Sequence, residues 1–398
     1  MSLLQDKLAK YTAPQEVKAQ GVYPYFRAIE SDQDTEVTMN GRKVLMFGSN
    51  AYTGLTNHPK VKEASMEMTR RYGTGCAGSR FLNGTLDIHV ALEERLAKFV
   101  GKEEALVFST GFFANMGTVS CLTGREDYII WDELDHASII EGKRLSMSQS
   151  FKFRHNDMQS LEKVLAKCEP DRVKLIVVDG VFSMEGDVCN LPEIVRLAKQ
   201  YKATVMVDEA HGLGVFGRCG RGVCDHFGLS ADVDIIMGTF SKSLASIGGF
   251  IATDHVTANY LRHNSRPFIF SASATPAAIG AVNAALDILE SEPERIENLW
   301  KLTQMALDGF KRMGCEIGNT STPIIPLFIR DFQKTLLVTK MLWEEGIFVN
   351  PVVPPAVPSN NTLIRFSLMA THTPEQISFA LQKIEKVFSQ LGLLSAKP

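Results

Sequence analysis

The sequence predicts an α/β protein with a large domain built on a mostly parallel sheet, followed by a smaller α+β domain. Short apolar runs alternate with amphipathic stretches from about residue 104 to 275, which is typical of repeated strand–helix–strand units. After Pro276 this alternation gives way to long helical stretches and a few further strands. The chain has 398 residues, 45% hydrophobic and 22% charged, which is enough for two or three globular domains.

The elements of the large domain follow one another in a regular order. We expect strands at Ala105–Ser109, Tyr128–Trp131, Phe151–Phe153, Lys174–Asp179, Thr204–Asp208, Ile235–Gly238 and Gly249–Ala252. Between them we expect helices at Phe113–Leu122, Ser138–Ser146, Met158–Lys167 and Leu191–Lys199. Because ligands of such sheets bind at the carboxyl ends of the strands, the residues just after each strand are the first candidates for a site.

The two ends of the chain are organised differently. The N-terminal residues 1–45 are expected to form an arm that contains a strand pair around the turn Asn40-Gly41. Residues 46–285 would form the large domain and residues 286–398 the small one. In the region after Pro276 we expect helices at Ala277–Leu289, Glu297–Arg312 and Glu375–Leu391, and strands at Ile324–Ile329, Phe348–Val353 and Leu363–Leu368.

Charge and cysteine usage exclude several classes of protein. The 42 basic and 45 acidic residues give a net charge of −3, which argues against a nucleic-acid-binding protein. The seven cysteines show no C-x-x-C spacing and the nine histidines no metal-ligand spacing, so we expect neither disulfides nor a metal site, and a cytoplasmic location. No apolar run is long enough to span a membrane, although peripheral membrane contact stays open.

Two familiar motifs are weak here. Gly73 to Gly78 matches G-x-G-x-x-G, but it follows a charged, helix-like stretch rather than a strand, so we interpret it as a permissive loop. Asp208-Glu209-Ala210-His211 spells the helicase DEAH box, yet the chain has no G-x-x-x-x-G-K-[ST] loop to hold a nucleotide phosphate.

A stronger chemical signal comes from Lys242 and Asp208. Each follows or ends a predicted buried strand, and Lys242 lies among small hydroxyl residues in GTFSKSLAS. Such a lysine could form a Schiff base with an aldehyde cofactor, and a carboxylate such as that of Asp208 could pair with the pyridine nitrogen of pyridoxal phosphate. Ala210 is small enough to lie against a ring, and Ser109 to Phe112 offers a glycine turn for a phosphate. Singly, these residues could equally be a snorkelling lysine and a capping carboxylate.

Taken together, the segments resemble the α-oxoamine synthases, a branch of the fold-type I pyridoxal phosphate enzymes. The resemblance runs from about Tyr23 to the final helix and includes 47–55, 73–85, 135–138, 179–186, 208–214 and 238–249. It implies the fold-type I architecture, with a seven-stranded sheet in the large domain. Within this family the chain is most similar to the homodimeric serine palmitoyltransferases of bacteria, because sibling synthases more often place Leu-Gly before the lysine.

The resemblance also implies roles for individual residues. Lys242 would carry the cofactor and act as the base, Asp208 would pair with the pyridine nitrogen, and His136 would stack on the ring and assist catalysis. The other implied cofactor contacts are Ala210 on the second ring face, His211 and Ser183 at the phenolic oxygen, Gly111, Phe112, Thr239 and Ser241 at the phosphate, and Ser273 (or Ser271) at the phosphate of the neighbouring subunit. Asn50 and Arg365 would bind substrate, with Arg365 at the amino-acid carboxylate.

The implied activity is a decarboxylating condensation of L-serine with a long-chain acyl-CoA such as palmitoyl-CoA, which yields 3-oxosphinganine, coenzyme A and CO2. The implied assembly is a homodimer with active sites at the subunit interface. A sibling synthase that uses glycine or alanine is the alternative. A non-catalytic partner subunit would lack the lysine, so the presence of Lys242 argues against that class.

Overall fold

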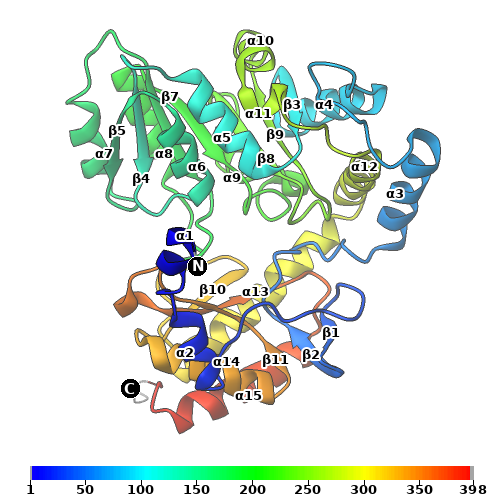
Figure 1. Cartoon of the computed structure of the whole chain (residues 1–398), viewed down its shortest axis with the longest axis vertical. Coiled ribbons are helices and arrows are strands. Elements are labelled where there is room, and N and C mark those ends of the chain that lie inside the picture. Colours follow the sequence, from blue (N-terminus) through cyan, green and yellow to red (C-terminus); the bar gives the residue numbers. More distant parts are fainter. Residues whose placement is uncertain (1, 395–398) are drawn as a thin grey trace. The chain divides into compact units, whose positions relative to one another are not determined.

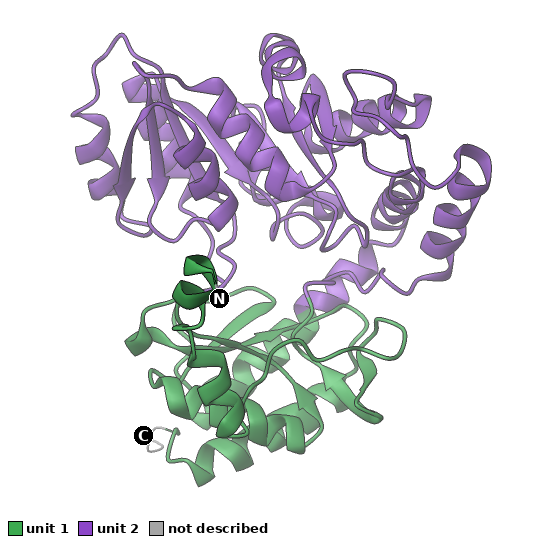
Figure 2. Ribbon diagram, viewed as in Figure 1, with its two compact units in different colours: residues 1–49, 301–398 green, residues 50–300 purple. Residues whose placement is uncertain are grey.

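A computed structural model describes residues 2–394, and in it the chain forms two compact units (Figures 1 and 2). Unit 2 is Asn50–Trp300, and unit 1 combines Met1–Ser49 with Lys301–Pro398. The sequence placed domain boundaries near residues 46 and 286, whereas the units change at residues 50 and 301. The residues expected as a separate arm share a unit with the C-terminal region, because a strand near residue 45 pairs with one near residue 347.

Unit 2 is built on a seven-stranded sheet with the order β3-β9-β8-β7-β6-β4-β5. Its strands are β3 (Glu104–Phe108), β4 (Tyr128–Asp132), β5 (Gln149–Phe153), β6 (Lys174–Asp179), β7 (Thr204–Asp208), β8 (Ile235–Thr239) and β9 (Gly249–Thr253). All seven lie where the sequence predicts them. Only β9 runs antiparallel to its neighbours in this sheet, so the predicted mostly parallel fold-type I sheet is confirmed.

The register of this sheet positions the site. Asp179 at the end of β6 pairs with Asp208 at the end of β7, and Asp208 pairs with Met237 on β8. All six residues of β6 are buried, as expected for a parallel strand that is covered on both faces. Three neighbouring strands therefore bring their carboxyl ends, and two carboxylates, to one edge of the sheet.

Helices surround the sheet of unit 2. They are α3 (Pro59–Tyr72), α4 (Asp87–Val100), α5 (Gly111–Leu122), α6 (Ala137–Leu145), α7 (Met158–Leu165), α8 (Leu191–Tyr201), α9 (Val223–His226), α10 (His255–Asn264), α11 (Arg266–Ile269) and α12 (Pro276–Ser291), with a 3₁₀ turn at Arg218–Gly220. Helices α5 and α6 pack side by side along the sheet (Figure 1). Ala114 and Val119 of α5 join Val177, Met206 and Met237 of the sheet in one core. Burial of such larger apolar side chains stabilises the fold by about 1.5–3 kcal/mol each.

Unit 1 contains two small sheets, β1-β2-β11 and β10-β13-β12. Its strands are β1 (Glu36–Met39), β2 (Arg42–Met46), β10 (Ile324–Phe328), β11 (Ile347–Phe348), β12 (Asn350–Val352) and β13 (Leu363–Ser367). Its helices are α1 (Leu3–Leu8), α2 (Ala13–Ala19), α14 (Phe332–Glu344) and α15 (Pro374–Gln390), with a 3₁₀ turn at Ser359–Asn361, and α13 (Pro293–Met313) begins in unit 2 and continues into unit 1. The predicted strand pair is confirmed: Asn40 and Gly41 both have positive φ in the two-residue turn that joins β1 to β2.

Candidate active site

A cavity of about 280 Å³ in unit 2 collects most of the residues predicted for the site. Nine of them line it, namely Gly111, Phe112, His136, Asp208, Ala210, His211, Thr239, Ser241 and Lys242. They come from the carboxyl ends of β7 and β8 and from the first residues of α5 and α6. The sheet thus brings together groups that are up to 131 residues apart in the chain, from Gly111 to Lys242.

Asp208 is 3% exposed, and both of its carboxylate oxygens accept hydrogen bonds. Oδ1 accepts the backbone N–H of Ala210 at 2.8 Å, and Oδ2 accepts the amide Nδ2 of Asn115 at 2.6 Å. Asn115 lies on α5, one helical turn after Gly111, and the sequence reasoning missed it. A single amide in an otherwise apolar helix segment is the signal that could have found it.

The amide of Asn115 also connects Asp208 to His136. Its Nδ2 donates to Ser138 Oγ at 2.9 Å, and Ser138 Oγ lies 2.7 Å from Nδ1 of His136. Nδ1 accepts the backbone N–H of Ser138 as well, so the ring carries its proton on Nε2. Burial lowers the pKa of His136, with Lys242 acting in the same direction and Asp208 opposing it. At neutral pH the imidazole is therefore neutral and fixed at the start of α6.

The start of α5 and the turn after β8 form a cradle made of glycine and hydroxyl groups. Thr110 caps α5 by accepting the N–H of Phe113 at 3.1 Å, and the first N–H groups of a helix lack partners within it. A Cβ on Gly111 would lie 2.7 Å from Thr239 Oγ1, and one on Gly249 would lie 2.6 Å from the Cα of Gly111. Only glycine permits this approach, and the resulting donors and hydroxyls fit a phosphate.

The sequence also missed the partner of His211. Tyr52 is fully buried, and its hydroxyl lies 2.6 Å from Nδ1 of His211. The same hydroxyl lies 3.3 Å from Oδ1 of Asn50. Tyr52 belongs to the segment Phe47–Leu55 that carries the resemblance, so the motif indicated the segment but not this contact.

The cavity contains a second carboxyl group, that of Asp179. Its backbone N–H donates to Asp135 Oδ1 at 2.9 Å, and the backbone N–H of Asp132 donates to Asp135 Oδ2 at 3.0 Å. Burial, together with the neighbouring carboxylates, raises the pKa of both Asp179 and Asp135 well above the usual range. Asp179 begins the segment 179–186 that carries the family resemblance, but the resemblance implied no role for it.

Four predicted site residues do not line this cavity. Ser183 lies half-buried in the turn after β6, and Ser273 Oγ donates to the carbonyl oxygen of Gly78 at 3.2 Å. Asn50 is the first residue of unit 2. Arg365 lies on β13 of unit 1, where it is 5% exposed and its Nη1 donates to Ser367 Oγ at 2.7 Å. Their proposed roles stay predictions.

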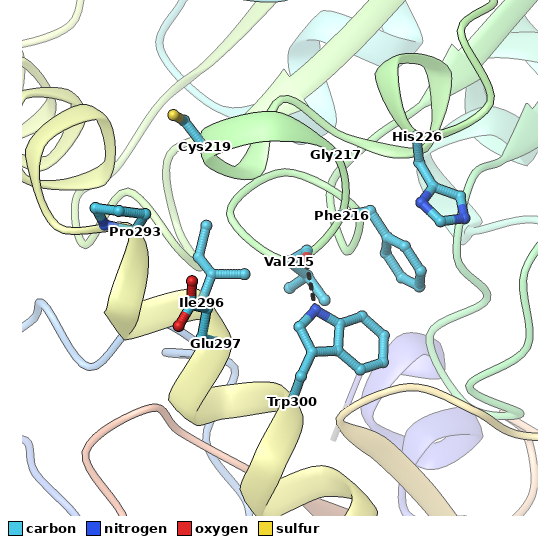
Figure 3. A pocket seen from close by; sticks show the side chains of 9 residues that line it. All are labelled: Val215, Phe216, Gly217, Cys219, His226, Pro293, Ile296, Glu297 and Trp300. Carbon is cyan, nitrogen blue, oxygen red and sulfur yellow. Dashed lines mark hydrogen bonds between the residues drawn. The ribbon is translucent and has the colours of Figure 1, made fainter.

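Unit 2 holds a larger cavity of about 480 Å³, which is mainly apolar (Figure 3). Val215, Phe216, Ile296 and Trp300 contribute to its wall, and Trp300 Nε1 donates to the carbonyl oxygen of Val215 at 3.0 Å. No lysine lines it, so it offers no amine for an aldehyde cofactor. Among residues 2–394, no group of three or more histidine, cysteine or acidic side chains is placed to hold a metal ion.

Comparisons with known proteins agree with this geometry. The chain is 65% identical to a serine palmitoyltransferase of Bacteroides thetaiotaomicron over 99% of this chain and 100% of that protein. It matches the structure of a Sphingomonas wittichii serine palmitoyltransferase with a TM-score of 0.95 and 37% identity, over 99% of this chain and 100% of that one. A serine palmitoyltransferase variant from S. paucimobilis, solved with a bound PLP–myriocin aldimine, matches with a TM-score of 0.95 and 35% identity, again over 99% and 100% of the two chains. A family model described as aminotransferase class I and II matches residues 42–384, so the chain belongs to that family.

Proposed function

We propose that the chain is a pyridoxal phosphate-dependent acyltransferase that condenses L-serine with a long-chain acyl-CoA such as palmitoyl-CoA. One observation carries the proposal: Lys242, Asp208 and the neutral His136 line a single cavity beside a cradle suited to a phosphate. The name of the 65% identical relative supports serine as the amino acid. The products would be 3-oxosphinganine, coenzyme A and CO2.

Each residue of the cavity has a separate role in this reaction. When bound, pyridoxal phosphate supplies an electron sink for the negative charge that develops at Cα of the amino acid. Asp208 offers a carboxylate, held by two donors, to the protonated ring nitrogen. Lys242 would hold the cofactor through its aldehyde, and its amine would serve as the base for the proton at Cα of serine. The hydroxyls of Thr239 and Ser241 and the N–H groups at the start of α5 would hold the phosphate.

The covalent balance of the proposed reaction is simple. A carbon–carbon bond forms between Cα of serine and the thioester carbonyl carbon, and the carbon–sulfur bond breaks to release coenzyme A. The serine carboxyl group then leaves as CO2, and a proton takes its place at Cα. We assign Arg365 to the substrate carboxylate and Asn50 to the substrate pocket, because these roles follow from the family resemblance.

A direct assay tests this function. Wild-type protein loaded with pyridoxal phosphate is given palmitoyl-CoA with L-serine, glycine or L-alanine, and the products are identified by mass spectrometry. We expect 3-oxosphinganine from serine and no turnover by Lys242→Ala. Preferred turnover of glycine or alanine would instead identify a sibling synthase. Retained turnover in the Lys242 variant would contradict the assignment altogether.

We also propose that the protein is a homodimer with its active sites at the subunit interface. The loop at residues 78–82 is joined to residues 270–273 by the Ser79–Ala272 bridge and by the Ser273 N–H bond to the Gly78 carbonyl oxygen. These two segments expose apolar side chains: Leu82 is 75% exposed and Phe270 is 74% exposed. Such a patch around Ser273 favours contact with a second copy of the chain.

Sedimentation tests the dimer. The double variant Leu82→Glu/Phe270→Glu should sediment as a monomer and lose turnover. Val256→Glu, which changes an equally exposed apolar residue on α10, should remain dimeric. A dimeric double variant would contradict this interface.

For location, we propose the cytoplasm, with peripheral contact to the membrane that receives the lipid product. No helix among residues 2–394 is both long and apolar enough to cross a membrane. Leu3, Leu4 and Leu8 on α1 are largely exposed and could contact lipid. Vesicle flotation tests this contact: the protein should float with anionic vesicles, and a Leu3→Ser/Leu4→Ser/Leu8→Ser variant should not. Equal recovery of both proteins would contradict it.

A further inference from the structure

The cofactor cavity contains two carboxyl groups in unlike settings. Asp208 and Asp179 are each 3% exposed and each ends a strand. Both oxygens of Asp208 accept a hydrogen bond, whereas Oδ1 of Asp179 is buried without a partner. The backbone N–H of His136 faces the Asp179 carboxyl group and favours its charged form only in part.

The sheet register makes these two groups direct neighbours, because Asp179 pairs with Asp208 across parallel strands. Two carboxylates that are side by side and shielded from water do not both ionise readily. The group with more donors keeps the negative charge, and here that group is Asp208. The proton then falls on Asp179.

The other ionisable groups around Asp179 do not reverse this outcome. Those that face it from adjoining elements are Asp208 at the end of β7, Lys242 after β8, Asp132 at the end of β4, Asp135 after β4, Glu209, Cys189 and His136. Burial is the main cause that raises the pKa of Asp179, with Asp208 next, while Lys242 and the His136 N–H oppose them. The net direction is strongly upward, in agreement with the geometry.

We propose that Asp179 is a positioning residue of the proposed reaction, on whose function this inference rests: it stays a neutral acid, leaves Asp208 as the sole negative charge facing the cofactor ring, and anchors His136 through its backbone N–H. Asp179 acts through these two residues. Its charge state is therefore as important as its shape.

Two substitutions, of which only Asn matches Asp in volume, test the two halves of the proposal. Asp179→Asn is neutral and keeps an acceptor for the His136 N–H, so its affinity for pyridoxal phosphate and its turnover should stay within about threefold of wild type. The pKa read from the absorbance of the bound cofactor should be unchanged. If Asp179 were ionised, removing its charge would shift that pKa by about one unit or more, since one unit corresponds to only 1.36 kcal/mol. Such a shift would overturn the neutral acid.

Asp179→Leu removes the acceptor and has a larger side chain, so cofactor affinity and turnover should fall about tenfold, whereas the Asn variant should keep both. Wild-type behaviour of a folded Leu variant would overturn the anchoring of His136. If circular dichroism shows that the Leu variant does not fold, protease protection of the loop at residues 133–136 is measured in the Asn variant instead. We expect the same protection as in wild type, and increased cleavage would contradict the anchoring of His136.

Asp135→Asn is the matched control. Asp135 is another buried acid beside Asp179, but it does not line the cavity. Its substitution should lower stability and leave the spectroscopic pKa unchanged. The readouts also separate this inference from the proposed function. Wild-type protein that binds no pyridoxal phosphate would refute the function. If the protein binds the cofactor but condenses no serine, cofactor affinity and the spectroscopic pKa still test the role of Asp179.

Discussion

The two halves of one sheet edge treat buried carboxylates differently. At the ends of β7 and β8, Asp208 is bound by Asn115 and by a backbone N–H beside Lys242 and a cavity. At the ends of β4 and β5, Asp132 is bound by the imidazole of His155 at 2.9 Å, and His155 Nε2 lies 2.8 Å from Asp187. In the first half the charged side chains face a cavity that can receive a cofactor. In the second half the two carboxylates, Asp132 and Asp187, are already paired with the imidazole of His155, and these hydrogen bonds connect the loops.

This difference shows that the donors around a strand-end aspartate decide its chemistry, rather than the residue type. Asp208 receives its donors from α5 and faces a cavity, so it is available to a ligand. The carboxylate oxygens of Asp132 accept hydrogen bonds from His155 and from the backbone N–H groups of Leu134 and Asn156. Asp179 lies between the two halves, on β6, and we infer that it is neutral. Three substitutions would sharpen or break this comparison.

The largest effect is expected at Asp208. Asp208→Asn keeps the shape but removes the charge that pairs with the protonated ring nitrogen. Loss of one partner of a buried pair costs roughly 3–4 kcal/mol, so kcat/KM for serine should fall about 100- to 1,000-fold. Steady-state kinetics with pyridoxal phosphate in excess measure it. A fall of less than tenfold would show that Asp208 is not the charged member of the two carboxyl groups.

An intermediate effect is expected at Asn115. Asn115→Ala removes a donor to Asp208 Oδ2 and leaves Ser138 Oγ without its donor. A lost partner of a buried polar group costs about 1–3 kcal/mol, so cofactor affinity should weaken about 10- to 100-fold. Fluorescence titration of the cofactor-free protein checks this. Unchanged affinity would mean that the clamp on Asp208 is not needed to receive the cofactor.

The smallest effect is expected at His155, and on stability rather than activity. Burial alone would lower the pKa of His155, but its hydrogen bonds to Asp132 and Asp187 outweigh burial and raise it to about 10. Because the folded pKa lies above the ordinary value of 6.5, the stabilisation is complete below pH 6.5 and is lost as the pH rises towards 10. His155→Gln should lose about 2 kcal/mol at pH 6 and flatten this dependence.

Urea unfolding at pH 6, 8 and 10 measures the His155 contribution. Turnover of the folded variant should stay within a few-fold of wild type, since His155 does not line the cofactor cavity. An equal pH slope in wild type and variant would show that His155 is not the cation of the second half.

The sequence predicted the first half of this comparison better than the second. Lys242 and Asp208 each follow a strand that can be recognised locally, and the rule that ligands bind at strand ends brings them together. Asn115 could not be predicted in this way, because its contact depends on how α5 is rotated over the sheet. The role of Asp179 depends on the β6–β7 register, which no local pattern specifies.

Longer-range features were also beyond local patterns. The pairing of Leu45 with Ile347 joins segments about 300 residues apart, so the N-terminal residues looked like a separate arm. The antiparallel direction of β9 has no signature in its apolar run Gly249–Ala252. The helices α4 and α14 were not predicted, although both are amphipathic and each packs against neighbouring elements of its own unit.

The central claim, that the cavity at the ends of β7 and β8 holds pyridoxal phosphate on Lys242, can be tested by chemical trapping. Borohydride reduction of the loaded protein makes a lysine–aldehyde linkage permanent, and peptide mass spectrometry then locates it. We predict one cofactor adduct, on the peptide that contains Lys242, which is absent from Lys242→Ala. An adduct on another lysine, or none on protein that has bound the cofactor, would contradict the account.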